Sequence, residues 1–155
     1  MITHHFADVF EAGDPRVHDL ESRVTEFSTF LVDVLGVEDT GARLEGVATY
    51  HDSCHALREL HIRSAPRRLL ANVRGLQLVE MDAAEECCGF GGTFSVKFAD
   101  VSGGMARTKI ESIERTGAGI VVSIDSSCLM QIQGALDRVA SKVRAMHLAE
   151  VLASR

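Results

Sequence analysis

Hydrophobic side chains recur along the chain with two different spacings, which predict alternating helices and strands. Apolar residues recur every three or four positions over residues 17–35, which predicts one helix that ends at Gly36. Short apolar runs predict four strands, at residues 47–51, 76–80, 120–124 and 143–146. Helices are predicted between and after these strands, at residues 55–73 with an interruption near Pro66, 101–116, 127–139 and 147–153.

Strands that alternate with helices favour βαβ crossovers and parallel strand pairing. We therefore expect an α/β protein, built as a three-layer sandwich with a roughly four-stranded parallel sheet and helices on both faces. A chain of 155 residues suits one domain with its own core. Within that single domain, 1–155, we expect an N-terminal helical segment, 1–40, and an α/β core, 41–155.

Composition and charge narrow the class of protein. The net charge is −6 and no basic patch stands out, which argues against a nucleic-acid partner. No apolar run is long enough for a transmembrane segment, and the first residues lack the profile of a secretory signal. We therefore expect a cytoplasmic protein, in which four cysteines indicate metal or redox chemistry before structural disulfides.

All four cysteines follow predicted strands. Cys54 comes three residues after the first strand, Cys87 and Cys88 lie in the loop after the second, and Cys128 follows the third. The carboxyl ends of parallel strands share one edge of the sheet, where open α/β folds bind their ligands. We therefore expect the four thiols to meet there, with His147 at the same edge after the fourth strand.

Two of the cysteine loops share a pattern. The stretches VATYHDSCHAL and VVSIDSSCLMQ both read as strand, Asp, Ser, Cys and helix. Asp52 or Ser53 in one loop, and Asp125 or Ser126 in the other, suits a helix N-cap. Each cysteine would then lie in a first helical turn, where backbone N–H groups and the helix dipole favour the metal-binding thiolate.

The third cysteine loop reads EECCGFGG. Its glycines, Gly89, Gly91 and Gly92, permit positive φ, so that backbone N–H groups can surround an anionic centre. An iron–sulfur cluster with thiolate ligands is one such centre. The loop is not a dinucleotide-binding fingerprint, because Phe94 stands where the third glycine would be.

Three histidines lie near the cysteines, but we do not interpret them as the primary ligands. His51 and His55 flank Cys54 and are interpreted as groups that support the ligands or lie at the surface. His147 is interpreted as a side chain at a helix start. No catalytic residue is assigned, and these histidines are the only acid–base candidates. The neighbouring pair Arg67-Arg68 predicts an ordinary solvated helix face.

Several chemistries fit two adjacent thiols and two distant ones. A tetrahedral set of four thiolates suits zinc and iron–sulfur clusters alike, although the paired C-x-x-C knuckles of structural zinc sites are absent. A disulfide between Cys87 and Cys88 would need a distorted ring and would have to persist in a reducing compartment. Thiol redox chemistry at this pair is a third alternative.

The pattern Cys54, Cys87-Cys88-Gly89 and Cys128 resembles the cysteine-rich CCG domain family. Over about residues 25–155, blocks such as YHDSCHALREL and CCGFGGTFSVKF are similar to the C-terminal half of lactate-utilisation protein A and to the iron–sulfur subunit of glycolate oxidase. The resemblance implies an iron–sulfur electron-transfer subunit of a complex that oxidises L-lactate, glycolate or another 2-hydroxy acid. It also implies a partner that is a ferredoxin-like iron–sulfur protein.

The resemblance further implies a ligand set. Cys54, Cys87, Cys88 and Cys128 would bind a [4Fe–4S] cluster, cubane or non-cubane, in a loop shaped by Gly89, Gly91 and Gly92. Gln131 departs from the fuller family pattern, which has a fifth cysteine there, and the chain holds one of the two CCG halves that members usually carry. The alternative is a zinc-stabilised, non-catalytic interaction subunit that docks on a redox partner. A homo-oligomer is compatible with both functions.

Overall fold

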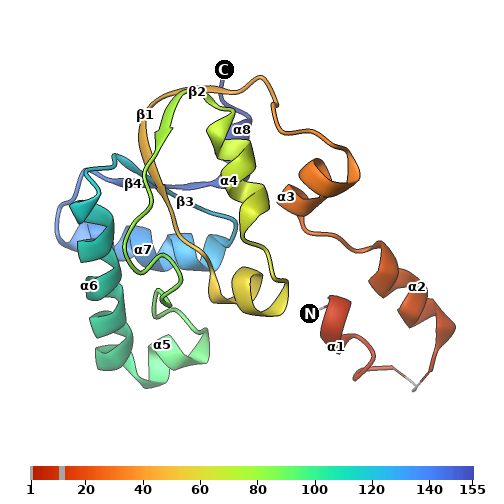
Figure 1. The fold of residues 1–155 in the computed structure, drawn as a ribbon. Coiled ribbons are helices and arrows are strands. Elements are labelled where there is room, and N and C mark those ends of the chain that lie inside the picture. The colour runs from red at the N-terminus through yellow and green to blue at the C-terminus, as the bar shows by residue number, and fades with distance from the viewer. Residues whose placement is uncertain (1, 11–12) are drawn as a thin grey trace.

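The computed structural model describes residues 2–10 and 13–155 and contains a four-stranded sheet (Figure 1). The order of the strands is β2-β1-β3-β4, and all three neighbouring pairs are parallel. The strands are β1 (Arg43–Tyr50), β2 (Arg74–Leu78), β3 (Ile120–Ser123) and β4 (Arg144–His147). The predicted parallel sheet is confirmed, although the second strand begins and ends two residues earlier than its apolar run indicates.

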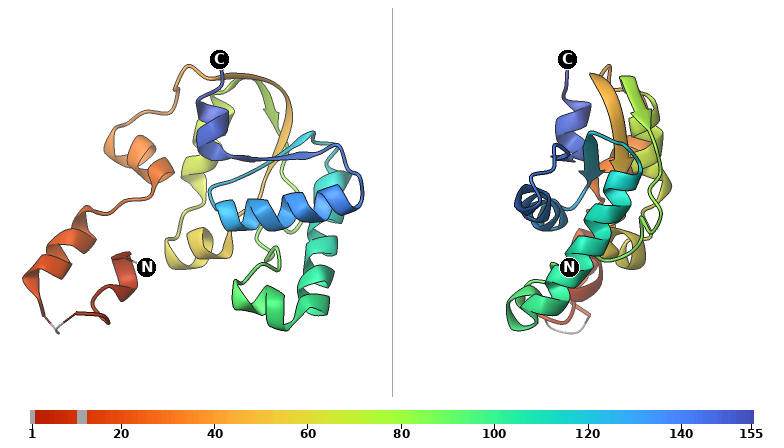
Figure 2. Two further views of the ribbon diagram at one scale, coloured as in Figure 1. Left: turned by 180° about the vertical axis from the view of Figure 1, so that it is seen from behind. Right: turned by 90° about the vertical axis from the view of Figure 1, so that its left-hand side faces the viewer.

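Helices cover both faces of the sheet, which confirms the three-layer sandwich (Figure 2). The helices α4 (Ser64–Ala71) and α8 (Leu148–Leu152) pack on one face, and α6 (Ala99–Arg115) and α7 (Ser126–Arg138) pack on the other. The central strand β3 shows the two cores directly. Ile120 and Val122 point into the first core, whereas Val121 points into the second, as alternation along a strand requires.

The N-terminal region differs from the prediction of one long helix. It contains α1 (Ile2–His5), α2 (Pro15–Arg23), α3 (Phe27–Thr29) and the π-helical turn η1 (Phe30–Val34). The chain is extended at Val24, and the Glu26 carboxylate accepts hydrogen bonds from the N–H groups of Ser28 and Thr29. This N-cap starts a new helix, so apolar spacing across residues 17–35 overlooked a break. The helices α1 and α2 project away from the sandwich (Figures 1 and 2).

The segment after β1 is also divided, but not at Pro66. It forms the π-helical turn η2 (His55–Glu59) and then α4, and the break between them contains His61 with a φ of 56°. Pro66 lies in the first turn of α4, where its missing N–H removes no helical hydrogen bond. A further short helix, α5 (Thr93–Lys97), follows the glycines. No helix in the part of the chain that the structure describes is long and apolar enough to cross a membrane.

Candidate metal centre

The loops that follow β1, β2 and β3 are joined to one another at one edge of the sheet. The His51 N–H donates to the Val122 carbonyl over 2.8 Å, and the Asp52 N–H donates to the Ala84 carbonyl over 3.1 Å. The Ser123 hydroxyl donates to the His51 carbonyl over 3.0 Å. The parallel topology thus brings three cysteine-bearing loops together, although they are far apart in the sequence.

Three side chains at this edge form a compact group of metal-binding type. One ring nitrogen of His51 and the sulfur atoms of Cys88 and Cys128 all lie within 4.8 Å of one another, and all three residues are buried. Neither ring nitrogen of His51 makes a hydrogen bond within the described residues, although the residue is 0% exposed. Two thiols and an unpartnered imidazole in one buried space can hold a metal ion.

Cys54 and Cys87 lie outside that group of three but next to it. All four cysteines are free, and Cys54 and Cys87 are partly exposed. Burial raises the pKa of Cys54, and so do the negative charge of Cys87 and a side-chain hydrogen bond with it. The charge of Cys54 in turn contributes to the raised pKa of Cys128. The thiols therefore interact in two pairs, Cys54 with Cys87 and Cys88 with Cys128, and the pairs also act on each other electrostatically.

Cys88 is the more acidic thiol of the buried pair. A hydrogen bond with Cys128 lowers the pKa of Cys88, burial opposes this shift, and the nearby His51 ring and the Phe90 N–H support it. The same hydrogen bond raises the pKa of Cys128, and burial raises it further. The thiolate, which is the form that binds metal, is thus centred on Cys88.

The glycines shape the loop around Cys87 and Cys88. All three have positive φ, which is 89° for Gly89, 53° for Gly91 and 56° for Gly92. A Cβ atom on Gly89 would come within 2.6 Å of the Ser102 carbonyl oxygen, so a side chain is excluded there. The Gly89 N–H lies 3.4 Å from the Cys87 sulfur and donates to it. That contact is the type expected around a thiolate-bound centre, and the role of the glycines in cofactor binding stays a prediction.

Comparison with known proteins gives the family. Residues 48–133, which are more than half of the chain, match the family model described as "Cysteine-rich domain", CCG. This chain belongs to the cysteine-rich CCG domain family. The matched range contains all four cysteines, His51 and the glycine loop, so the residues that meet at the sheet edge are those of the family's domain.

The chain is also similar to curated proteins named lactate utilization protein A. It is 45% identical to the one from Lysinibacillus sphaericus over 97% of this chain and 67% of that protein. It is 50% identical to the one from Geobacillus sp. over 88% of this chain and 57% of that protein. The protein from Bacillus subtilis is 48% identical over 92% of this chain and 61% of its own length. The chain thus spans about three fifths of these relatives.

The two helix starts in this CCG domain use their polar residues differently. Asp125 caps α7, because its carboxylate accepts hydrogen bonds from the N–H groups of Ser127 and Cys128. In the other loop the Ser53 hydroxyl accepts from the Ala56 N–H over 3.3 Å. Asp52 instead pairs with Arg67 through two hydrogen bonds of 2.9 and 2.7 Å. The prediction of a solvated pair is therefore wrong for Arg67.

The other two histidines are engaged elsewhere. The His55 ring lies 2.9 Å from the Glu59 carboxylate on a partly exposed turn. His147 caps α8, where its Nδ1 accepts from the Ala149 N–H over 3.1 Å. Its Nε2 therefore carries the hydrogen and donates to the Ile124 carbonyl over 3.0 Å. Of the three histidines, only His51 is directed at the cysteines.

Helix α6 contributes three buried polar side chains that the sequence analysis missed. Ser102 donates to the Gly89 carbonyl over 2.8 Å, Lys109 donates to the Ala83 carbonyl over 2.5 Å, and Ser112 donates to the Asp82 carbonyl. All three acceptors lie in the loop that carries Cys87 and Cys88. The sequence signal that could have found them is the presence of polar residues on the core-facing side of an amphipathic helix, where apolar residues are expected.

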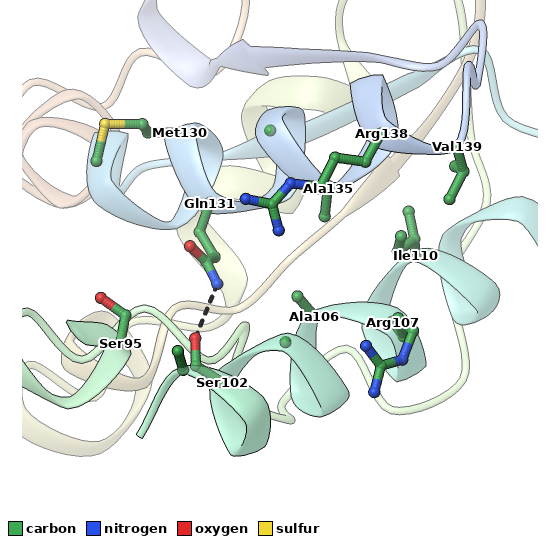
Figure 3. Close-up of a pocket in the computed structure, with 13 residues that line it drawn as sticks. Ser95, Ser102, Ala106, Arg107, Ile110, Met130, Gln131, Ala135, Arg138 and Val139 are labelled. Carbon is green, nitrogen blue, oxygen red and sulfur yellow. Dashed lines mark hydrogen bonds between the residues drawn. The ribbon is translucent and has the colours of Figure 1, made fainter. Parts of the chain in front are cut away.

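Gln131 extends this network from α7. Its side-chain amide donates to the Ser102 hydroxyl over 3.1 Å (Figure 3). The position at which the fuller CCG pattern has a fifth cysteine thus supports the loop through Ser102. Gln131 also lines a cavity of about 380 Å³ between α6 and α7, which contains no cysteine. That cavity is separate from the group formed by His51, Cys88 and Cys128.

Proposed function

We propose that this chain is an iron–sulfur electron-transfer subunit, or part of one, in the oxidation of L-lactate or a related 2-hydroxy acid such as glycolate. The observation that carries the proposal is the meeting of Cys88 and Cys128 with an unpartnered, buried His51 within 4.8 Å. Cys54 and Cys87 interact electrostatically with each other beside this group. Four thiols from three loops are a donor set that fits an iron–sulfur cluster.

In this proposal Cys54, Cys87, Cys88 and Cys128 would hold a [4Fe–4S] cluster, which when bound supplies one-electron transfer. The N–H groups of Gly89 and Phe90 donate to sulfur atoms and so stabilise thiolate charge. The remainder of 41–155 positions these groups, and 1–40 adds a helical segment to the same domain.

The residues at the site favour an electron relay over chemistry on a bound substrate. His147 has both ring nitrogens in hydrogen bonds to the backbone, and His55 is paired with Glu59. His51 is 0% exposed, so a substrate in solvent cannot reach it directly. A general acid or base must lie within hydrogen-bond reach of the atom that it serves.

The relatives support the metabolic context. Their name, lactate utilization protein A, motivates the lactate part of the proposal. We propose a ferredoxin-like iron–sulfur protein as partner and the cytoplasm as the compartment. Because the chain spans 57% to 67% of these relatives, we expect efficient electron transfer only when the rest of the assembly is present.

A second candidate function is a zinc-stabilised interaction subunit that docks on a redox partner. The specific observation in its favour is the spacing of His51, Cys88 and Cys128, whose ligand atoms are close enough for a single ion. Zinc accepts mixed imidazole and thiolate ligands and has no redox chemistry. The two functions therefore differ in the inorganic group and not in the fold.

Anaerobic metal and sulfide analysis separates the two functions. We expect iron and acid-labile sulfide after reconstitution, together with broad visible absorption. A colourless protein with stoichiometric zinc, unchanged by reconstitution with iron and sulfide, would support the interaction subunit instead.

The Cys88→Ser variant tests the assignment of the site. We expect it to lose the iron but to keep the circular dichroism of the folded sheet, because the ligand loop lies outside the strands. Val96→Ser is the control, since Val96 is exposed on α5 beside the glycine loop, and it should bind metal normally. Iron at the wild-type ratio in Cys88→Ser would contradict the proposed site.

A further inference from the structure

Lys109 is a buried lysine without a carboxylate in contact. It is 2% exposed, and its ammonium donates one hydrogen bond, to the Ala83 carbonyl. Among the described residues, no carboxylate oxygen forms an ion pair with it. Lysine is almost never fully buried unless it is paired, because desolvation of an ammonium is expensive. The fold therefore contains a buried positive charge, and the anionic group that offsets this charge has to be identified.

The charges around Lys109 identify that partner. Burial lowers the pKa of Lys109, while negative charge on Glu86, Cys88, Asp52 and Cys87 opposes the shift. Glu86 is exposed to solvent, so its charge is screened. Asp52 already forms a bidentate pair with Arg67. The two thiols are the remaining anionic groups.

We propose that Lys109 is the counter-charge of the metal centre. Four thiolates around a doubly charged cluster core leave a net charge of about −2, and most of this charge is created when the cluster replaces the thiol protons. The buried ammonium stabilises that state across a medium of low dielectric. Lys109 should therefore raise metal affinity and also raise the reduction potential, because reduction adds a further negative charge. This inference rests on the proposed function.

The structure provides a control that separates charge from tethering. Ser112 lies on the same helix as Lys109 and donates to the carbonyl of Asp82, the residue before Ala83. Both side chains hold the cysteine loop, but only Lys109 carries a charge. Lys109→Met removes the charge and the tether, whereas Ser112→Ala removes a tether alone.

The first test measures the centre itself in the full chain. After anaerobic reconstitution we expect the Lys109→Met midpoint potential to be more negative than that of the wild type. A chelator should remove iron from the reconstituted cluster about tenfold faster in Lys109→Met, which corresponds to roughly one pKa unit of lost charge stabilisation. Ser112→Ala should keep the wild-type midpoint potential and should change the loss of iron to the chelator by no more than about twofold. Lys109→Arg should retain most of the wild-type potential. Equal effects of Lys109→Met and Ser112→Ala, or no effect of either, would overturn the inference.

The second test uses thermal unfolding without and with metal. Metal binding should raise the unfolding temperature of Lys109→Met less than that of the wild type, because the charge that the ammonium offsets is largest in the metal-bound state. An equal rise in unfolding temperature on metal binding in both proteins would overturn the inference, even if the metal-free variant is destabilised by loss of the hydrogen bond to Ala83. If the wild type takes up neither iron nor zinc, the proposed function fails. If the wild type binds metal and Lys109→Met matches it, only the role of Lys109 fails.

Discussion

The loops at Cys54 and Cys128 look alike in sequence but deliver their thiols in different ways. The thiol of Cys128 is buried in the first turn of a regular 13-residue helix, α7. The thiol of Cys54 is partly exposed at the start of η2, a short π-helical turn. One loop therefore presents a fixed ligand within the core, and the other presents a ligand at the rim.

The spacing between the aspartate and the cysteine accounts for part of this difference. Asp125 is separated from Cys128 by two serines, so a helix capped by Asp125 places the cysteine at the third helical position. The Cys128 N–H then donates to the cap over 3.2 Å. In the other loop a single serine separates Asp52 from Cys54. There the Ser53 hydroxyl accepts from the Ala56 N–H, and Cys54 is the residue that precedes η2.

The guanidinium of Arg67 accounts for the rest of the difference between the two loops. The side chain of Asp52 is 1% exposed and is held by Arg67, whose guanidinium also contacts Glu80 and lies 4.9 Å from the centre of the Tyr50 ring. Asp125 has no such ion pair among the described residues. A capping sequence thus does not by itself decide whether an aspartate caps a helix, because an arginine elsewhere in the chain competes for the carboxylate.

The largest difference between the loops should appear when each thiol is removed. We expect Cys128→Ser to abolish both iron–sulfur assembly and zinc binding, because it removes a member of the group of three. Cys54→Ser should abolish cluster assembly but leave one zinc ion bound through His51, Cys88 and Cys128. Metal and sulfide per chain after parallel reconstitutions measure both effects. Full iron and sulfide in Cys54→Ser would show that the rim thiol is not a ligand.

The buried ion pair at the first loop provides the next largest effect. Arg67→Met leaves the Asp52 carboxylate buried without its partner, which should destabilise the protein by about 3 kcal/mol. Denaturant unfolding measures the loss. Arg68→Met is the matched control, because Arg68 is about half exposed where it pairs with Glu38 and Asp33, and it should cost less than about 1 kcal/mol. Similar losses in both variants would mean that Arg67 is an ordinary surface arginine.

The sequence predicted the parallel pairing, though not the order of the strands, and it predicted the edge at which the cysteines lie, because both depend on local patterns. The run Ile120-Val121-Val122 indicates a strand wherever its neighbours lie, and parallel pairing then places every following loop at one edge. Asp125 could be proposed as a cap for the same reason, since its acceptors are two and three residues away.

The functions of other residues depend on contacts between distant segments. His51 was expected to support the ligands or lie at the surface, and only the packing of three loops shows that it is buried beside Cys88 and Cys128. Arg67 finds Asp52 across fifteen positions, and Lys109 finds Ala83 across twenty-six. No periodicity encodes such pairs, although a buried polar residue on an amphipathic helix marks a position that needs explanation.

The smallest expected effect is at the cap of the second loop. Asp125→Ala should destabilise the protein by about 1 kcal/mol, because the N–H groups of Ser127 and Cys128 lose their acceptor. Burial would raise the pKa of Asp125, but hydrogen bonds from Ser127 and Cys128 outweigh it and hold the pKa below its ordinary value of 3.8. The stabilisation is therefore complete above about pH 4 and is lost as the pH falls through the lower, folded-state pKa.

Denaturant unfolding of metal-free protein should show the difference between wild type and Asp125→Ala at pH 7, and this difference should shrink in acid. Ser126→Ala, at an exposed neighbour, should show no such pH dependence. A difference that grows on acidification would mean that Asp125 is stabilised in its protonated form, and the contrast between the capping and the ion-paired aspartate would then fail.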